Sequence, residues 1–342
     1  MSILSLFLAV IGMACGLVVI DQPGPLAQDL PFVVARGDSL SVVADRLDDA
    51  GALTPVSVLS GRDALIGTAE LLGLSSDIKA GEYLIKRNSS LRSILRTLTT
   101  GQSINRSVTI PEGWTVWQAV ERLHDTDGLS GQVVTLPPEG TLLPDTYFYT
   151  LGEDRQAVLD RMMAAHDALF VDLWAARAEG LPYTRRQDAL ILASIIERET
   201  GQSAERDLVA SVYVNRLREG WRLQADPTVI YGLTQGQGPL RRGLRRSELQ
   251  DASNPYNTYQ IRGLPPGPIA NPGAAALRAA LNPASTDYYF FVASCEGGHQ
   301  FSASLEAHNR AVTEYRACEA SLKAPSPPSV RPNAPTYVDV AN

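Results

Sequence analysis

Hydrophobic and polar positions divide the chain into three regions. The first twenty residues contain no charged side chain. From there to about residue 320, short apolar runs alternate with stretches whose apolar residues recur every three or four positions, which is the spacing of one helix face. Residues 321–342 are rich in proline and lack this spacing. The pattern predicts an N-terminal apolar helix, a folded α+β region and a disordered tail at 321–342.

The apolar segment at residues 1–20 is long enough to cross a bilayer, which takes ~20 residues. A cleavable signal peptide is the alternative, and it would begin with basic residues and contain a shorter apolar run. The segment has neither feature. We therefore expect an uncleaved membrane anchor at 1–20, followed by a linker at 21–31 that contains proline and glycine.

Three stretches of the folded region share one pattern, in which a short apolar run is followed by Ser or Thr and then by helix-spaced leucines. The hydroxyl residues are Ser39, Ser90 and Thr115. Ser and Thr are preferred at helix N-caps, because their side-chain oxygen accepts a hydrogen bond from the first turn. The pattern predicts a strand, a turn and a capped helix at each place, and by itself it indicates no function.

The first of these stretches, GDSLSVVADRL at residues 37–47, resembles a LysM-like module. The role of that family is contact with amino-sugar polymers. The resemblance implies a small LysM-like βα module at 32–105.

Charge and metal-binding motifs exclude several classes of protein. The net charge is −7, whereas nucleic-acid binding normally requires a clustered basic surface. The sequence contains no CxxC or HExxH motif and no histidines at ligand spacing, so we expect no metal site and no cofactor. Cys295 and Cys318 can pair if this region is exported, because that compartment is oxidising.

The stretch LILASIIERETG, at residues 190–201, predicts a helix that is almost wholly apolar except near its C-terminal end. Thr184 and Gln187 have the spacing of a capping box, which places the start of the helix near Arg185. Gly201 is suited to end it.

Two glutamates of this helix point in nearly opposite directions, because they lie ~200° apart at about 100° per residue. Glu197 shares the small, apolar face, where burial keeps a carboxyl group protonated as a general acid requires. Glu199 shares a face with Asp188, and we expect it to face water. A structural ion pair of Glu197 with Arg206 or Arg216 is the alternative to catalysis.

The loops after this helix mix Asn, Gln, Thr and Tyr, which suit sugars because they offer amide hydrogen bonds and aromatic platforms. Plain turn chemistry is the alternative explanation for such loops. Asn271 is expected to cap a further helix, and residues 296–298 to turn a hairpin that precedes a terminal helix. The candidate substrate-binding residues are Gln224, Asp226, Thr228, Asn257 and Tyr259.

Taken together, these stretches resemble the YceG-like family, the membrane-anchored endolytic murein transglycosylases. The matching stretches occur in order: LLPDTY, ASIIERETG, ERDLVASVYVNRL, LQADPTVIYG, NPYNTY, GLPPGPIANPG and HNRAV. The resemblance covers nearly the whole chain beyond the anchor and implies a YceG-like catalytic domain of mixed α/β structure at 106–320. The pair Cys295 and Cys318 is not a general feature of that family.

The resemblance also implies an activity and a location. It implies a bacterial inner-membrane protein whose periplasmic domain cleaves nascent peptidoglycan strands between N-acetylmuramic acid and N-acetylglucosamine. The family's catalytic glutamate falls on Glu197. Partners implied by the family are the glycan strands, penicillin-binding synthases and other proteins of cell-wall synthesis.

A lytic transglycosylase needs one carboxyl group, which acts first as acid and then as base and leaves a 1,6-anhydro end. A hydrolase that uses two carboxylates is a second possibility, with Asp226 as the partner. A non-catalytic scaffold that binds the cell wall is a third, and it would not need Glu197.

Overall fold

The computed structural model describes residues 20–323 except 36, 57, 102–103 and 105. Residues 1–19 of the predicted anchor and residues 324–342 of the predicted tail lie outside the described part. The described chain forms two compact units, one from residues 20–111, 119–136 and 145–162, and the other from 112–118, 137–144 and 163–323. Helices and small two-stranded sheets make up both units, so the predicted mixture of α and β structure is confirmed. The boundary predicted between residues 105 and 106 stays a prediction.

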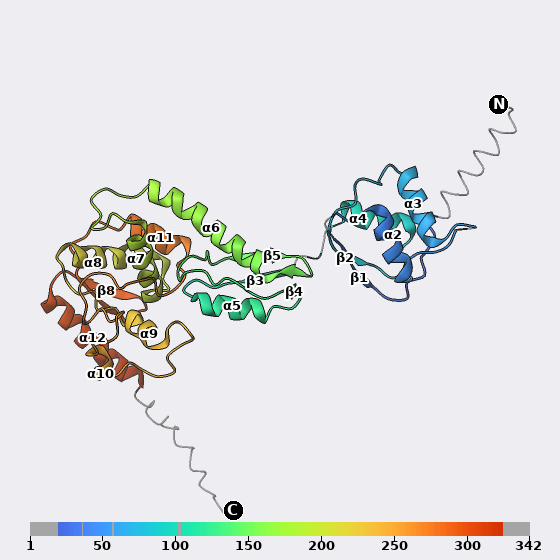
Figure 1. Ribbon diagram of the computed structural model, residues 1–342. Helices are drawn as coiled ribbons and strands as arrows, with labels where there is room; N and C mark the ends of the chain where they lie inside the picture. The colour runs from blue at the N-terminus through green and yellow to red at the C-terminus, as the bar shows by residue number, and fades with distance from the viewer. Residues whose placement is uncertain (1–19, 36, 57, 102–103, 105, 324–342) are drawn as a thin grey trace, which may run out of the picture. The chain divides into compact units, whose positions relative to one another are not determined.

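The first unit begins with two strands that enclose two helices in the sequence (Figure 1). The elements are β1 (Leu30–Val34), α2 (Leu40–Asp49), α3 (Gly61–Leu71), β2 (Gly81–Ile85) and α4 (Leu91–Thr100). Strands β1 and β2 pair antiparallel, with Leu30 opposite Ile85. Buried side chains from all five elements, including Leu47, Leu65 and Leu95, form one core.

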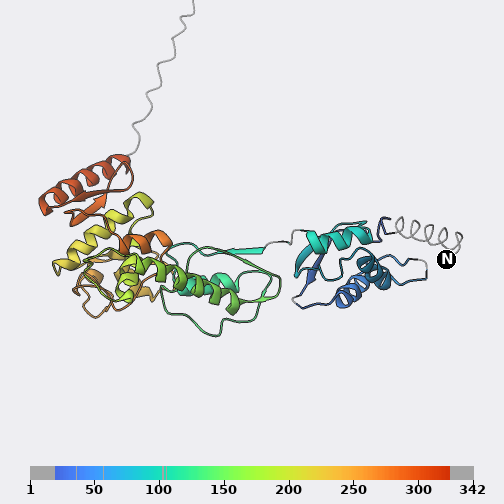
Figure 2. The same ribbon diagram turned by 90° about the horizontal axis from the view of Figure 1, so that it is seen from above.

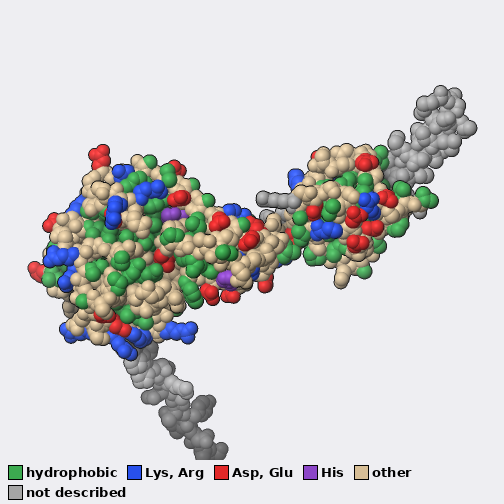
Figure 3. Space-filling view, in the orientation of Figure 1, with side chains coloured by type: hydrophobic (Ala, Val, Ile, Leu, Met, Phe, Trp, Pro, Cys, Tyr) green, Lys and Arg blue, Asp and Glu red, His purple; other side chains and the backbone are tan. Residues whose placement is uncertain are grey.

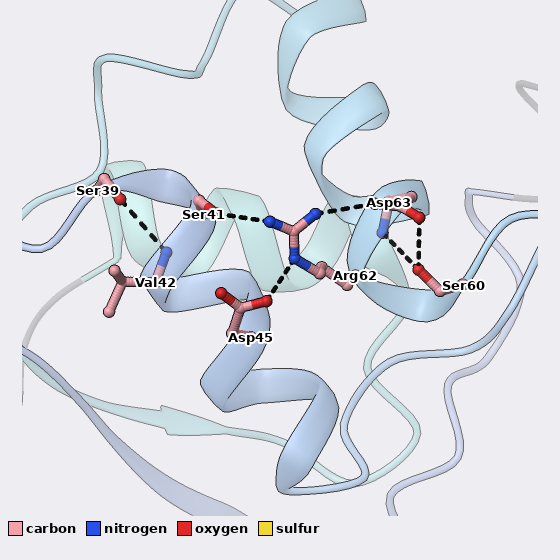
Figure 4. A network of polar contacts seen from close by, with 7 residues as sticks. All are labelled: Ser39, Ser41, Val42, Asp45, Ser60, Arg62 and Asp63. Atoms are coloured by element: carbon pink, nitrogen blue, oxygen red, sulfur yellow. Dashed lines mark hydrogen bonds and ion pairs between the residues drawn. The ribbon is translucent and has the colours of Figure 1, made fainter.

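Helices α2 and α3 are joined by the guanidinium group of Arg62 (Figure 4). Arg62 donates to Asp45 and Ser41 on α2 and to Asp63 on its own helix. These contacts are partly exposed, and exposed ion pairs contribute little to stability. Their role is therefore to fix the direction of two short helices whose stability comes from the core.

The N-caps predicted from the repeated pattern are confirmed. Ser39 accepts from the backbone N–H of Val42, and Ser90 accepts from that of Ser93. Thr115 accepts from the backbone N–H of Gln118 at 3.3 Å.

The rest of the first unit contains two small sheets. Strand β3 (Arg106–Thr109) pairs antiparallel with β5 (Thr146–Tyr149), and β4 (Leu129–Ser130) pairs parallel with β6 (Glu153–Asp154). Most of α5 (Val116–His124) and the first turns of α6 (Arg155–Ala175) belong to this unit.

The second unit is built around α7 (Arg186–Glu199), which packs against three other helices. Those three are α8 (Arg206–Arg218), α9 (Asp226–Thr234) and α11 (Ala274–Leu281). Every residue from Ala189 to Glu197 is buried, so α7 has no solvent face over two turns. A helix with this pattern is a core helix.

Further elements complete the second unit. They are a 3₁₀ turn at Ser203–Glu205, α10 (Arg246–Leu249), the strands β7 (Phe290–Ala293) and β8 (His299–Ser302), and α12 (Leu305–Lys323). Helix α12 continues to Lys323, so residues 321–323 are helical rather than part of the predicted tail. On the face in view in Figure 3, basic and acidic side chains are interspersed over this unit.

Two predicted helix caps in this unit are wrong. Helix α7 starts after Arg185, which confirms the predicted start, but no side-chain cap is present there, so the capping box of Thr184 and Gln187 is wrong. Helix α11 starts after Gly273, because the amide of Asn271 is committed elsewhere: it donates to Trp114 and accepts from the N–H of Leu142. Packing around each helix start, which the local sequence does not reveal, decides both cases.

Among the residues described, no helix combines the length and the apolar character that a membrane span requires.

The predicted hairpin and terminal helix are present, and a disulfide joins them. Strands β7 and β8 pair antiparallel, with Ala293 opposite His299. Helix α12 contacts both strands, and both views show it beside the hairpin (Figures 1 and 2). Cys295, in the turn of the hairpin, is bonded to Cys318 near the end of α12.

Replacing both cysteines, as C295S together with C318S, should lower the free energy of unfolding by ~3 kcal/mol, because the cross-link restricts the unfolded chain. Urea unfolding of protein exported to an oxidising compartment measures this. Thiol labelling of the denatured protein without reductant gives the control: labelling of Cys295 and Cys318 there would show that they are not bonded.

Candidate active site

A cavity of about 500 Å³ lies at the C-terminal end of α7, within the second unit. Its walls come from α7, α8, the loop before α9, the hairpin β7–β8 and the start of α12. The polar side chains that line it are Glu199, Tyr213, Arg216, Gln224, Asp226, Tyr259, His299, His308 and Asn309. Its wall therefore combines carboxylates, aromatic rings and amides.

Glu199 is the carboxyl group that α7 contributes to the cavity. The hydroxyl of the fully buried Tyr213 donates to its Oε1 at 2.7 Å. No other described residue bonds to this carboxyl group, so Oε2 is left to carry a proton or to meet a ligand. Burial raises the pKa of Glu199 to about 7, and the nearby charge of Asp226 also acts to raise it, whereas the Tyr213 hydroxyl acts to lower it.

Three of the five predicted binding residues line this cavity. They are Gln224, Asp226 and Tyr259. The Tyr259 hydroxyl donates to Asp226 at 2.7 Å, which fixes the direction of that carboxylate. Gln224 adopts a left-handed backbone conformation with φ at 53°, which non-glycine residues adopt infrequently.

The other two predicted binding residues are structural. Thr228 is fully buried and donates to the carbonyl of Ala225. Asn257 is also fully buried, and its side-chain amide donates to three backbone carbonyls between residues 248 and 251. Neither lines the cavity, and their assignment to substrate binding stays a prediction.

Glu197 points away from this cavity and holds three segments together. Its Oε1 lies 3.2 Å from Nη2 of Arg206, and its Oε2 accepts from the backbone N–H of Gly273 at 2.9 Å. Arg206 also contacts Glu112 at 3.2 Å. Burial raises the pKa of Glu197, which Glu112 reinforces and the contacts to Gly273 and Arg206 oppose. The ion pair with Arg206, which the sequence left as an alternative, is present.

The two glutamates do point in different directions, but the expectation that Glu199 faces water is wrong. Glu199 is only partly exposed and lies against α8 through Tyr213. Asp188 shares its helix face but lies at the other end of α7, where Arg185 pairs with it. The same face of α7 is thus exposed to solvent at the N-terminal end of the helix and forms part of the cavity wall at its C-terminal end.

The sequence reasoning missed the wall that faces Glu199. Arg216 donates to the carbonyls of Leu223 and Tyr289 and is almost completely buried. His299 follows the two glycines of the hairpin turn, and HNRAV contains His308 and Asn309. The sequence did contain a signal for this wall: His299 directly follows the predicted hairpin turn, and His308 and Asn309 lie near the start of the predicted terminal helix.

Within the described part of the chain, no group of three His, Cys, Asp or Glu side chains is arranged to hold a metal ion.

Comparisons with known proteins assign the chain to a family. The model of the YceG-like family matches residues 32–314. The endolytic murein transglycosylase of Bacillus subtilis is 29% identical over 272 residues, which cover 70% of this chain and 74% of that protein. The endolytic murein transglycosylase of Streptococcus pneumoniae serotype 2 is 26% identical over 70% of this chain, which spans only 51% of that protein.

A solved structure agrees with this assignment. A YceG-like protein of Listeria monocytogenes is 26% identical and superposes with a TM-score of 0.51. The match covers 83% of this chain and 98% of that one. The fold is therefore shared over most of the chain.

Replacing Glu199 by Gln should make stability less dependent on pH. The folded-state pKa of about 7 lies above the ordinary value of 4.5, so this group's contribution is fully present below pH 4.5 and is lost as pH rises through 7. At pH 8, E199Q should be more stable than the unsubstituted protein by at most ~3 kcal/mol. Thermal midpoints at pH 5 and pH 8 measure this.

The matched variant E197Q should behave in the opposite way. It leaves the buried Arg206 without its buried partner, which should cost roughly 2 kcal/mol at pH 8, since Glu112 still contacts the guanidinium. Equal midpoints for E197Q and E199Q at pH 8 would contradict the separate roles given to the two glutamates.

Proposed function

The chain belongs to the YceG-like family, and from that membership together with the cavity at Glu199 we propose that it is an endolytic murein transglycosylase. Such an enzyme is a lyase that cleaves the bond between N-acetylmuramic acid and N-acetylglucosamine inside a peptidoglycan strand. The observation that carries the proposal is a single carboxyl group with a pKa of about 7, held by Tyr213 in a polar cavity. Curated relatives with this activity match most of the chain.

The proposed reaction needs one proton and one carboxyl group. Protonated Glu199 donates its proton to the glycosidic oxygen, and the bond from that oxygen to C1 of muramic acid breaks. The 6-hydroxyl oxygen of the same sugar bonds to C1, and the Glu199 carboxylate takes the hydroxyl proton. The carboxyl group is thereby restored, and the new end is a 1,6-anhydro sugar. A pKa near 7 suits both halves, because the group must give up and recover a proton at neutral pH.

Our assignment of the acid to Glu199 differs from the family-based expectation of Glu197. Glu197 is committed to Arg206 and to the N–H of Gly273, and its side chain is 4% exposed. A carboxyl group in such a position cannot approach a polymer without losing these contacts. The assignment to Glu197 nevertheless stays a prediction that the two variants below decide.

Hydrolysis is the second candidate activity, because a second carboxylate lines the same cavity. Asp226 is exposed there and accepts from Tyr259. A two-carboxylate hydrolase would use it to activate water. We favour the transglycosylase, because the neighbouring hydroxyl is part of the same sugar and an intramolecular attack needs no water to be positioned.

The N-terminal part of the chain is proposed to bring the catalytic unit to the cell wall. The order β1, α2, α3, β2 with an antiparallel strand pair supports a LysM-like module that contacts glycan strands. The apolar character of residues 1–20 supports an anchor in the bacterial inner membrane, with the rest in the periplasm. The disulfide is compatible with an oxidising compartment. Penicillin-binding synthases and other wall-synthesis proteins are the proposed partners.

E199Q should lower the rate of strand cleavage by ~10²–10⁴, the usual contribution of a general acid and base. E197Q should lower it less than about tenfold under conditions where the protein is folded. Both are measured on purified glycan strands, with circular dichroism to confirm folding. Loss of cleavage in E197Q with activity kept in E199Q would return the acid to Glu197. Full cleavage by both variants would favour a binding scaffold or another site.

The products should carry 1,6-anhydromuramic ends, and cuts should fall inside strands as well as near their ends. Borohydride separates the two chemistries, because hydrolysis leaves a reducible end and the anhydro product does not. Mass spectrometry of the treated digest reads both the ends and the fragment lengths. Mainly reducible ends would instead support hydrolysis with Asp226, and release of only terminal disaccharides would contradict internal cutting.

A further inference from the structure

A second pair of titratable groups, Glu205 and His299, lies at the wall of the cavity. Both oxygens of the Glu205 carboxylate hold the same residue: Oε1 accepts from the backbone N–H of His299 at 2.8 Å, and Oε2 lies 2.7 Å from its Nδ1. The side chains are 14% and 19% exposed. His299 lines the cavity that contains Glu199.

The surrounding residues fit this pair closely. Gly298 has φ at 78°, and a Cβ there would lie 2.2 Å from Oε1 of Glu205, so any larger residue would push the carboxylate away. The Phe291 ring meets the imidazole edge to face, with centroids 5.3 Å apart. The Thr200 hydroxyl donates to Glu205 at 3.3 Å. The imidazole is thus held by a carboxylate, by its own backbone and by an aromatic ring.

This arrangement determines where the imidazole carries protons. Contact of Nδ1 with the Glu205 carboxylate requires a hydrogen on Nδ1. Among the described residues, Nε2 has no bonding partner. Nε2 is therefore the ring nitrogen that remains free to act in the cavity.

We propose that His299, held by Glu205, is a positioning residue that stabilises the carboxylate form of Glu199 during the reaction. This inference rests on the proposed function, in which one carboxyl group must first lose a proton and then take one up. A cation on the cavity wall favours the state between these two steps, in which Glu199 is a carboxylate. His299 acts through Glu199 and is not itself the acid or the base.

Other groups also act on Glu199, and each comes from a different packed element. From α8, Tyr213 donates to it, and Arg216 acts at longer range while bonded to backbone carbonyls. From the start of α9, Asp226 opposes its ionisation and is itself bonded to Tyr259. Among these groups and His299, only His299 has an imidazole, the side-chain type that serves as a charge switch near neutral pH. Its removal should therefore be visible in a pH profile.

The test compares H299Q with the unsubstituted full-length protein in detergent, using kcat and KM on glycan strands from pH 5 to pH 9. Activity requires protonated Glu199, so it falls as pH rises through the pKa of that group. Without the cation the pKa of Glu199 rises, so the alkaline limb of the curve of kcat against pH should move to higher pH by about one unit. The value of kcat at neutral pH should fall about tenfold, with KM changed less than about twofold.

Two further variants separate charge from structure. E205Q keeps the imidazole but removes the carboxylate that holds it in place, so the alkaline limb of its pH profile should move in the same direction by a smaller amount. H308Q is the matched control: His308 lines the same cavity and stacks on Phe290 at 5.1 Å, and its limb should stay in place. If H299Q does not fold, E205Q still tests the proposal.

A direct titration distinguishes this inference from the proposed function. The carboxyl ¹³C signal of Glu199, assigned by its loss in E199Q, should titrate at higher pH in H299Q. If cleavage persists in E199Q, the proposed function fails, while this titration still reports on His299. An unchanged titration in H299Q, or a lower kcat with an unmoved limb, overturns the inference. A large rise in KM alone also overturns it, because that result indicates substrate binding.

Discussion

The rotation of α7 about its own axis is the constraint on which the second unit depends. The helix is buried along two turns, so apolar packing alone would tolerate small rotations that exchange one buried side chain for another. The contacts of Glu197 with Arg206 and with the N–H of Gly273 remove that freedom, because a buried charge is costly unless its partners are met. With Glu197 fixed, the rotation of the helix is set, and the side chain of Glu199, two residues later, must point into the cavity.

Burial of two carboxyl groups at one helix end has an energetic cost, and the two groups offset it differently. Glu197 is compensated by a cation and a backbone donor, and its contribution is structural. Glu199 has one neutral donor, Tyr213, and its ionised form is left poorly compensated. A poorly compensated carboxyl group is what proton transfer near neutral pH requires. Under the proposed assignment of the acid to Glu199, stability and function therefore divide between two residues of the same type, two positions apart.

Much of this arrangement could be predicted from local sequence, and the reasons for the failures are specific. The caps at Ser39 and Ser90, the hairpin turn and the opposed directions of the two glutamates depend on neighbours in the chain, and all are correct. The environment of Glu199 depends on Tyr213 of α8, which one helix cannot reveal. Asn257 resembles a ligand-binding amide in sequence, but it satisfies carbonyls of its own loop. Family resemblance predicted the fold and the activity, whereas its assignment of the catalytic residue to Glu197 stays a prediction.

The disulfide between the hairpin and α12 bears on where the protein can accept substitutions around the cavity. Cys295 and Cys318 join segments only 23 residues apart, and α12 contacts both strands of the hairpin. This wall of the cavity is therefore tied internally by the disulfide, and it also packs on the core through Phe291 and Phe301, whereas the opposite wall is the core helix α7. Substitutions at the exposed positions of α12 can alter this wall at little cost to the core. The proposed reactive group thus lies on the wall that the core holds constant, while the exposed part of the other wall remains open to variation.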